Sequence, residues 1–481
     1  MNLSCKQSTG YGLFHFWAFS HYWRFKSKES SYLLVLIGNT PEKIINMNFK
    51  SLSEIQEEAE NFITGGMSSS FRANLYTGLP MYANKAQGPR FTDCTGKEFI
   101  DFFMCHGSVI LGHDRYEVKS ALHDVIEKGY YAGFDDWPTV NLAQKICESI
   151  PAAEQIRFVN SGTEGTLLAL RLARGHTGRD LIVRIDGHYH GCQDYLFANN
   201  LVSKIDLSND GSKRSKTIGR TSGVPEVMDS LVVTIPWNNF EILEKVLHEE
   251  EGKVAGIIMN VIDYNNGVFL TTSEYLNFTK EQAKKYGIVL IFDEVLSGFK
   301  TGISCGQGYY GVEPDLCIIG KALSNNVPLG VVAGKKEVMK NIMDPINPVI
   351  AGGTFSGNQF GIAAGNASLT ILKQEDFYKK FLFRADNFYE SLKSMFGERG
   401  VPAVVQHLGA GFHIFLGTEE PINNYNDLNR VDRKLTRKFF AICIENGLYF
   451  HTDFTISAAH DELTLNEALE KMDMAIKKLK Y

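Results

Sequence analysis

Two residues with complementary chemistry, an acid and a lysine, each follow an apolar run of strand length. Asp293 comes directly after Ile288–Phe292, and Lys321 comes directly after Leu316–Gly320. A run without a polar break predicts a strand buried on both faces, and open parallel α/β sheets bind ligands at the carboxyl ends of their strands. The acid and the amine could form a buried ion pair. They could instead serve pyridoxal phosphate (PLP), which needs a lysine for its Schiff base and an acid for its ring nitrogen.

A short polar turn could hold the phosphate of such a cofactor. Ser161, Gly162 and Thr163 follow the predicted strand Ile156–Val159 and open a helix rich in leucine and alanine that ends near Gly175. The free N–H groups, the hydroxyls and the positive dipole end of a helix favour phosphate binding. The same residue types also make ordinary helix caps, so both interpretations stay open at this point.

Other side chains also have a structural and a chemical interpretation. Tyr189 follows the predicted strand Leu181–Ile185, where it could be a core aromatic or a flat face for a planar ring. Arg72, in a loop, could be a surface charge or could grip a substrate carboxylate. His188 and His190 lack the carboxylate or cysteine partners that would complete a metal site, so we expect no metal.

Composition excludes several classes of partner. The 481 residues carry a net charge of −6 and no long basic run, which argues against nucleic acid and against an anionic membrane surface. The apolar run Tyr32–Ile37 is too short to span a bilayer. The eight cysteines are scattered without a Cys-x-x-Cys pair, which favours a reducing compartment. We therefore expect a cytoplasmic globular protein.

The apolar runs alternate with helical patterns, which predicts a mainly parallel sheet with helices on both faces, an α/β fold. The expected strands are 156–159, 181–185, 231–235, 255–259, 288–292, 316–319 and 330–333. Beyond about residue 363 the pattern is α+β, with a strand at 411–416 and helices near 430–446 and 465–479.

We expect four parts along the chain. Residues 1–46 form an N-terminal appendage that we expect to be poorly ordered, and residues 47–110 form the first part of a small domain. A large domain follows at 111–362, and residues 363–481 complete the small domain. The polar stretch 205–223 predicts a long loop within the large domain, and loops of that length often act as lids.

From about Phe49 to the C-terminus, the chain resembles the class III, fold-type I, PLP-dependent aminotransferases, most closely their glutamate-1-semialdehyde aminomutase branch. The motifs that carry the resemblance are Val159–Glu164, Tyr189–Gly191, Ile291–Val295, Gly320–Ala322 and Gly353–Asn358. The resemblance implies a large PLP-binding domain with a seven-stranded sheet and a smaller α+β domain built from both chain ends. It also implies a homodimer with active sites at the subunit interface.

The resemblance also implies roles for single residues. Lys321 would form the Schiff base and move protons at the substrate carbon, and Asp293 would keep the ring nitrogen protonated, because a nearby carboxylate favours the charged form of a base. Tyr189 would stack on the ring, and Thr354 would reach the phosphate of the neighbouring subunit. The implied catalytic residues are Lys321, Asp293 and Tyr189. The implied cofactor-binding residues are Ser161, Gly162, Thr163, Tyr189, Asn265, Asp293, Val295, Lys321 and Thr354.

The substrate side departs from the family pattern. Ser69 and Arg72 match the anion-gripping loop of the branch, but His106 stands where the branch tends to carry tryptophan. Asn260 stands where the family has a glutamate, and the segment near Asp453 is shortened. These departures favour a substrate other than glutamate semialdehyde.

We therefore expect an aminotransferase that moves an amino group from an amino acid donor to an aldehyde or keto acceptor, with a keto or aldehyde sugar as the first candidate. The alternatives are an intramolecular aminomutase of the glutamate-1-semialdehyde type and a non-catalytic relative that keeps the PLP fold.

Overall fold

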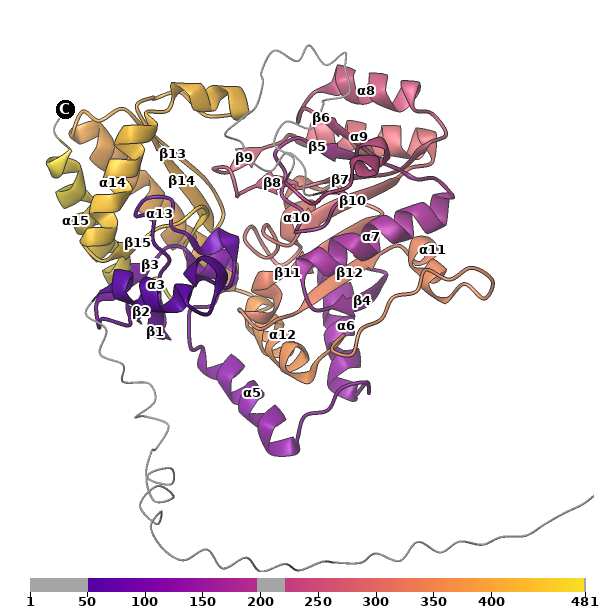
Figure 1. The fold of residues 1–481 in the computed structure, drawn as a ribbon, viewed down its shortest axis with the longest axis horizontal. Helices are drawn as coiled ribbons and strands as arrows, with labels where there is room; N and C mark the ends of the chain where they lie inside the picture. Colours follow the sequence, from indigo (N-terminus) through magenta and orange to yellow (C-terminus); the bar gives the residue numbers. More distant parts are fainter. Residues whose placement is uncertain (1–50, 197–220, 480–481) are drawn as a thin grey trace, which may run out of the picture. The chain divides into compact units, whose positions relative to one another are not determined.

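The seven apolar runs form one sheet in the computed structural model, which describes residues 51–196 and 221–479 (Figure 1). In spatial order the strands are β4 (Gln155–Val159), β12 (Gly330–Gly334), β11 (Leu316–Gly320), β10 (Val289–Glu294), β7 (Val254–Met259), β5 (Leu181–Ile185) and β6 (Val232–Ile235). Strand β12 runs antiparallel to both of its neighbours, β11 and β4, and all the other pairs of this sheet are parallel. The connection from β11 to β12, residues 321–329, is shorter than the crossover that a parallel neighbour requires. The predicted, mainly parallel sheet is confirmed.

The sheet is buried on both faces, and alternate residues of each strand belong to different cores. Ile291 and Ile318 pack with helix α7 (Gly162–Thr177) on one face. Phe292 and Ile319 face the other core, which also contains residues of helices α8 (Phe240–Glu249) and α9 (Ser273–Tyr286). Because both faces are covered, every position of β10 is apolar until its end, where Asp293 appears.

Two smaller sheets complete the α+β part. One contains β1 (Ala83–Gln87), β2 (Arg90–Asp93), β3 (Glu98–Asp101) and β15 (Leu448–Tyr449), and the other contains β13 (Ala403–Leu408), β14 (Gly411–Leu416) and β16 (Phe454–Thr455). The pairing of Leu448 with Ile100 joins the two ends of the described chain in one sheet. A small domain built from both chain ends is therefore confirmed. A short hairpin, β8 (Ile262–Asp263) and β9 (Phe269–Leu270), follows β7.

The remaining helices surround these sheets. They are α3 (Leu52–Glu60), α4 (Met104–Gly107), α5 (Tyr116–Lys128), α6 (Trp137–Ser149), α10 (Cys305–Tyr310), α11 (Lys336–Met339), α12 (Gln359–Leu372), α13 (Phe377–Glu398), α14 (Arg433–Glu445) and α15 (Glu462–Lys478). Short 3-10 helices are η1 (Thr64–Gly66), η2 (Ser70–Arg72), η4 (Glu226–Leu231), η5 (Lys321–Ser324), η6 (Lys340–Met343) and η7 (Tyr425–Arg430).

Some expectations fall outside the described residues. The appendage 1–46 and residues 205–220 of the expected long loop are not described, so both stay predictions, as do the boundaries of the four expected parts. Within the described ranges, no helix combines the length and the apolar character that a membrane span requires. The hairpin β8–β9 and the strands β13, β15 and β16 were not predicted, because they are short or carry mixed polar residues.

The close approach of α7 to the sheet predicts an asymmetric response to alanine substitution. A Cβ at Gly165 would lie 2.6 Å from the Cγ2 atom of Ile318, whereas a Cβ at Gly397, in α13, would meet open space. We expect Gly165→Ala to lower the free energy of unfolding by about 1–3 kcal/mol. We expect Gly397→Ala to raise it by about 0.5–1 kcal/mol. Denaturant unfolding measures both values. Adding Ile318→Ala to Gly165→Ala should cost less than the sum of the single changes, and strict additivity would contradict the contact.

Candidate active site

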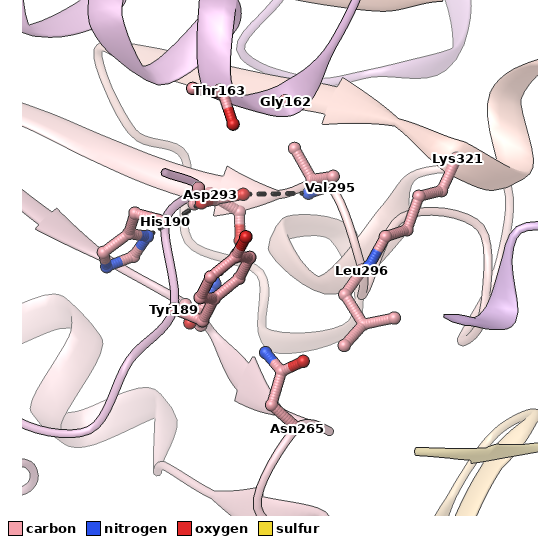
Figure 2. A pocket seen from close by; sticks show the side chains of 11 residues that line it. Gly162, Thr163, Tyr189, His190, Asn265, Asp293, Val295, Leu296 and Lys321 are labelled. Carbon is pink, nitrogen blue, oxygen red and sulfur yellow. Dashed lines mark hydrogen bonds and ion pairs between the residues drawn. The ribbon is translucent and has the colours of Figure 1, made fainter. Parts of the chain in front are cut away.

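A cavity of about 190 Å³ lies where five strands of the large sheet end (Figure 2). Residues that follow β4, β5, β7 and β11, together with the end of β10, supply most of its wall. The lining residues are Gly162, Thr163, Tyr189, His190, Gly191, Asn260, Asn265, Asp293, Val295, Leu296 and Lys321. Residues up to 159 positions apart in sequence thus meet at one edge of the sheet, as the strand-end rule predicts.

Asp293 is the buried acid of the cavity. Its Oδ2 atom lies 2.7 Å from Nδ1 of His190, and its Oδ1 atom accepts the N–H of Val295 at 3.0 Å. Burial lowers the pKa of His190, and the neighbouring Asp293 opposes that shift only in part. The neutral imidazole that this shift favours can donate from Nδ1, so the Asp293 carboxyl group keeps acceptor capacity for an N–H in the cavity.

Lys321 is the amine of the cavity. Lys321 is the first residue of η5, directly after β11, and its backbone is left-handed, with φ 46°. Burial lowers the pKa of Lys321, while Asp453 and Asp293 act in the opposite direction. A lowered pKa increases the fraction of neutral amine, which is the nucleophilic form. Figure 2 shows the side chain extending toward Leu296, with Tyr189 and Asp293 across the cavity.

The start of α7 forms another wall. The first N–H groups of a helix have no partner inside it, and here they belong to Gly162 and Thr163. A Cβ at Gly162 would lie 2.9 Å from Val295, so glycine lets the helix end approach that side chain. The Oγ1 atom of Thr163 accepts the N–H of Cys192 at 3.2 Å and keeps its own proton to donate. This arrangement can hold an anionic group such as phosphate.

A second cluster of buried charges lies beside Lys321. Asp453 is 1% exposed, and its Oδ1 atom is 3.0 Å from Nδ1 of His106 and accepts the hydroxyl of Thr452 at 2.8 Å. Burial would raise the pKa of Asp453, but the charges of His106, Lys321 and Lys300 outweigh it and hold the pKa well below its usual range. The Oδ2 atom of Asp453 is buried and has no hydrogen-bond partner among the described residues.

Lys300 is the second buried lysine of this cluster. Its Nζ atom donates to Oγ1 of Thr455 at 3.0 Å and lies 4.6 Å from the ring centroid of Tyr264. The pKa of Lys300 is lowered to about 7, mainly by burial; Asp453 opposes this shift and Lys321 adds to it. The turn Met104–Gly107, which packs against both β16 and η5, has positive φ at all four residues. Its backbone therefore depends on surrounding contacts to stay in place.

Several predicted site residues lie outside the cavity wall. The Ser161 hydroxyl caps α7 by accepting the N–H of Glu164 at 3.2 Å, so the simple cap interpretation describes its contact. Arg72 and Thr354 are exposed, and His106 contacts Asp453 rather than the cavity. Their predicted binding roles, and that of Ser161, stay predictions.

The loop that carries Arg72 nevertheless reaches the site. The Phe71 ring packs edge-on against Tyr189, with 5.5 Å between ring centroids. The Ser69 hydroxyl accepts the N–H of Phe71 at 3.3 Å and so shapes the loop. An anion held by this loop would therefore lie on the Tyr189 side of the site.

Sequence reasoning assigned no role to His190, Lys300 or Asp453. His190 was part of a recognised motif, but its contact with Asp293 joins residues 103 positions apart. Asp453 follows no strand pattern, and its partners are distant in sequence. The one sequence signal was a charged residue next to apolar residues, because charged side chains are rarely buried without a partner. In the described part of the chain, no three His, Cys, Asp or Glu side chains are placed to hold a metal ion.

Comparison with known proteins gives one consistent result. The family model of class-III aminotransferases matches residues 72–472. The glutamate-1-semialdehyde 2,1-aminomutase of Persephonella marina is 33% identical over 429 residues, which cover 88% of this chain and 97% of that protein. Further relatives with the same name are 32–33% identical.

Solved structures are similar along nearly the whole chain. An omega-transaminase from Sphaerobacter thermophilus has a TM-score of 0.81 and 25% identity, covering 90% of this chain and 99% of that one. A transaminase solved with PLP bound has a TM-score of 0.79 and 25% identity, covering 89% and 97%.

The buried position of Asp453 predicts a pH-dependent loss of stability when its charge is removed. We expect Asp453→Asn to lower the free energy of unfolding at pH 7 by about 3–5 kcal/mol, because buried cations lose their partner. The folded pKa is depressed, so the ionised form stabilises the fold above the unfolded pKa of about 3.9. That contribution disappears as the pH falls toward the folded pKa. Denaturant unfolding between pH 2 and 8 should show a difference from wild type that is constant above about pH 5 and shrinks only below about pH 4.

The matched control is Asp473→Asn, which breaks ion pairs with Arg399 and Lys477 near the surface. Exposed pairs contribute little, so this variant should stay close to wild type at every pH. A loss for Asp453→Asn that is equally small would contradict the buried charge cluster.

Proposed function

Since the chain belongs to the class-III aminotransferases, we propose that it is an aminomutase of the glutamate-1-semialdehyde type, which moves an amino group within one small molecule. The observation that carries the proposal is the 33% identity to enzymes of that name over nearly the full chain. Our first expectation, transfer between an amino donor and a separate carbonyl acceptor, is supported less strongly and stands as the second candidate.

PLP is the cofactor of this family, and the cavity fits it. The amine of Lys321, the carboxyl group of Asp293 and the N–H groups at the start of α7 are the groups that an aldehyde, a pyridine nitrogen and a phosphate require. When bound, PLP supplies an aldehyde that links to amines and a ring that withdraws electrons from the substrate carbon.

Lys321 would hold PLP covalently and, once released, would move protons at the substrate carbon. Its lowered pKa keeps part of the amine neutral, which both tasks need. Asp293 would accept the ring N–H with one carboxylate oxygen while His190 and the Val295 N–H fix the carboxylate. Burial of the acid strengthens this pairing, because water cannot compete for it.

The other cavity residues would orient the ring. Tyr189 and Val295 would contact its two faces, and Asn265 would lie near its hydroxyl group. Thr163 would donate its hydroxyl to the phosphate, while its Oγ1 lone pair stays with Cys192. Each of these side chains lines the cavity and comes from a different turn of the chain, so together they would hold the ring on several sides.

The substrate would occupy the side of Lys321 that faces Asn260. The Oδ1 atom of Asn260 is buried without a partner among the described residues, while its Nδ2 group donates to the Asp293 carbonyl at 3.0 Å. Arg72 and Ser69 would bind a substrate carboxylate. The free Asn260 oxygen and the nearby His106–Asp453 pair are polar, and this observation keeps a hydroxylated acceptor such as a keto or aldehyde sugar as the second candidate.

Stoichiometry separates the two candidates. Purified holoenzyme given glutamate 1-semialdehyde alone should form 5-aminolevulinate in equal amount, without a second keto product, as followed by chromatography. An aminotransferase would instead need an added amino donor and would release one keto acid per turnover. We expect Lys321→Ala to lack the visible absorbance of covalently bound PLP and to lose turnover by several orders of magnitude, because both roles of the amine are removed.

The outcomes are distinct. Turnover only with a separate donor and a carbonyl acceptor would reject the aminomutase and support the second candidate. Wild-type protein that binds no PLP would make the chain a non-catalytic relative. Unchanged turnover in Lys321→Ala would overturn the assignment of the lysine.

We also propose that the enzyme is a homodimer with the active site at the subunit interface. We propose as the dimer surface five exposed large apolar side chains of the segments 130–137 and 350–355: Tyr130 (70% exposed), Phe134 (74%), Trp137 (73%), Ile350 (70%) and Phe355 (65%). The two segments are linked, because the Tyr131 N–H donates to the Gln359 side chain and the Tyr130 ring packs against Phe360. An exposed apolar patch of this kind is typical of a protein interface. Thr354 lies next to Phe355, so it would meet the second copy there.

The dimer proposal predicts a dissociating variant. We expect the double variant Phe134→Glu/Trp137→Glu to sediment as a monomer and to bind PLP more weakly, because the surface is charged and Thr354 loses its target. Analytical ultracentrifugation with parallel PLP titration measures both. Phe383→Glu, at a side chain 66% exposed on α13, is the control and should stay dimeric. A wild-type monomer with full PLP affinity would contradict the proposal. A cytoplasmic location stays a prediction.

A further inference from the structure

A tyrosine from the C-terminal part reaches the turn that carries Asn265. We propose that Tyr425, acting through Asp263, is a positioning residue that holds Asn265 and Tyr189 in place around PLP. The inference rests on the cavity being the PLP site, as set out under the proposed function. It concerns residues outside the cavity wall and the way in which they fix that wall.

Asp263 is the centre of the network. It is fully buried at the end of β8, and its Oδ2 atom accepts the Tyr425 hydroxyl at 2.7 Å and the Nδ2 group of Asn266 at 2.8 Å. Its Oδ1 atom accepts the backbone N–H of Asn265 at 3.1 Å. Tyr425 therefore orients the carboxylate that fixes the backbone of a cavity residue.

The Tyr425 ring also packs against the turn that leads to Tyr189. A Cβ at Gly187 would lie 2.2 Å from the Tyr425 ring, so the ring packs directly on this glycine. Asn266 donates from the same Nδ2 group to the Gly187 carbonyl at 3.3 Å. Gly187 precedes the cavity residue Tyr189 by two positions. One side chain thus contacts both turns that face the ring site.

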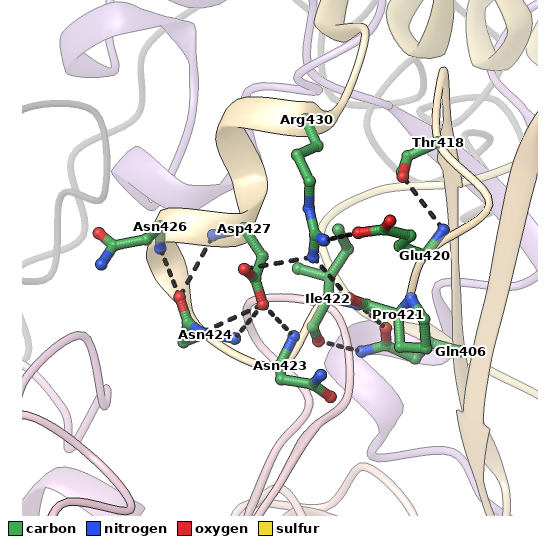
Figure 3. Close-up of polar contacts among 10 residues, drawn as sticks. All are labelled: Gln406, Thr418, Glu420, Pro421, Ile422, Asn423, Asn424, Asn426, Asp427 and Arg430. Atoms are coloured by element: carbon green, nitrogen blue, oxygen red, sulfur yellow. Dashed lines mark hydrogen bonds and ion pairs between the residues drawn. The ribbon is translucent and has the colours of Figure 1, made fainter.

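The segment that carries Tyr425 is fixed by its own polar contacts (Figure 3). Arg430 pairs with Glu420 and with Asp427 and donates to the Pro421 carbonyl at 2.7 Å. The Asn424 side chain accepts the N–H groups of the following turn in a capping box. A tyrosine on such a braced segment can position its neighbours.

Gln406 of β13 ties the same segment to the hairpin. Its amide exchanges hydrogen bonds with the backbone of Ile422, at 2.8 and 2.9 Å, and donates to the carbonyls of Gly267 and Val268 at 3.0 and 3.1 Å. The β8–β9 hairpin is therefore held at both Asp263 and its tip.

The charges are consistent with a donating hydroxyl. Burial raises the pKa of Tyr425 well above its usual value, and Asp263 adds to that shift, so the hydroxyl stays protonated. Burial raises the pKa of Asp263 to about 6, against the effect of its hydrogen bonds from Asn266 and Tyr425. The carboxylate is then mostly ionised at pH 7.5 and accepts from all three donors. Arg184 and Asp186 are the other charged groups near Tyr425.

The test uses the holoenzyme at pH 7.5 and replaces the hydroxyl alone. Tyr425→Phe should weaken PLP binding about 3- to 10-fold, the effect of one net hydrogen bond, and should shift the visible absorbance band of bound PLP. Tyr389→Phe is the matched control, because that buried tyrosine also donates to one acceptor, the Gly409 carbonyl at 3.1 Å, away from the cavity. Both variants should lower the melting temperature by a similar amount. Tyr389→Phe should leave the PLP affinity and the absorbance band unchanged.

A double-mutant cycle supplies the second readout. In an Asn265→Ala background, Tyr425→Phe should weaken PLP binding by much less than it does in wild type, because the residue being positioned is gone. Fully additive effects, or wild-type affinity and spectrum in Tyr425→Phe, would overturn the inference. Wild-type protein that fails to bind PLP would instead reject the proposed function, so the two failures are distinguishable.

Discussion

The burial of ionised groups next to one another is the constraint on which this structure depends. Burial lowers the pKa values of Lys321 and Lys300; Asp453 opposes both shifts, and Asp293 opposes that of Lys321. Because a buried charge is tolerated only with its partner, every element that carries one of these residues must be placed accurately. The seven-stranded sheet positions Asp293 and Lys321, and the C-terminal part supplies Asp453.

Precision in the cavity comes from the second layer of residues rather than from the wall alone. Asp293 is fixed by His190, and the Asn265 backbone is fixed by Asp263. A cofactor held mainly by short turns needs such support, because loops without it are mobile.

Much of the fold and part of the site could be predicted from the sequence. Strands buried on both faces have a local signature, so all seven were found, and residues at their ends, such as Asp293 and Lys321, were placed correctly. Strand β12 runs antiparallel because the connection that precedes it is short, and the apolar pattern of a strand does not indicate its direction. The pairing of His106 with Asp453 could not be predicted, because it joins residues 347 positions apart without a local pattern.

The pairing of β15 with β3 has a consequence for the order of events during synthesis. Leu448 must emerge from the ribosome before Ile100 can complete its sheet, and Asp453 follows only five residues later. Until then Lys321 and Lys300 have no Asp453 to balance them. The charge cluster beside the cavity can therefore form only after residue 453 has been made, although every residue that lines the cavity is made earlier.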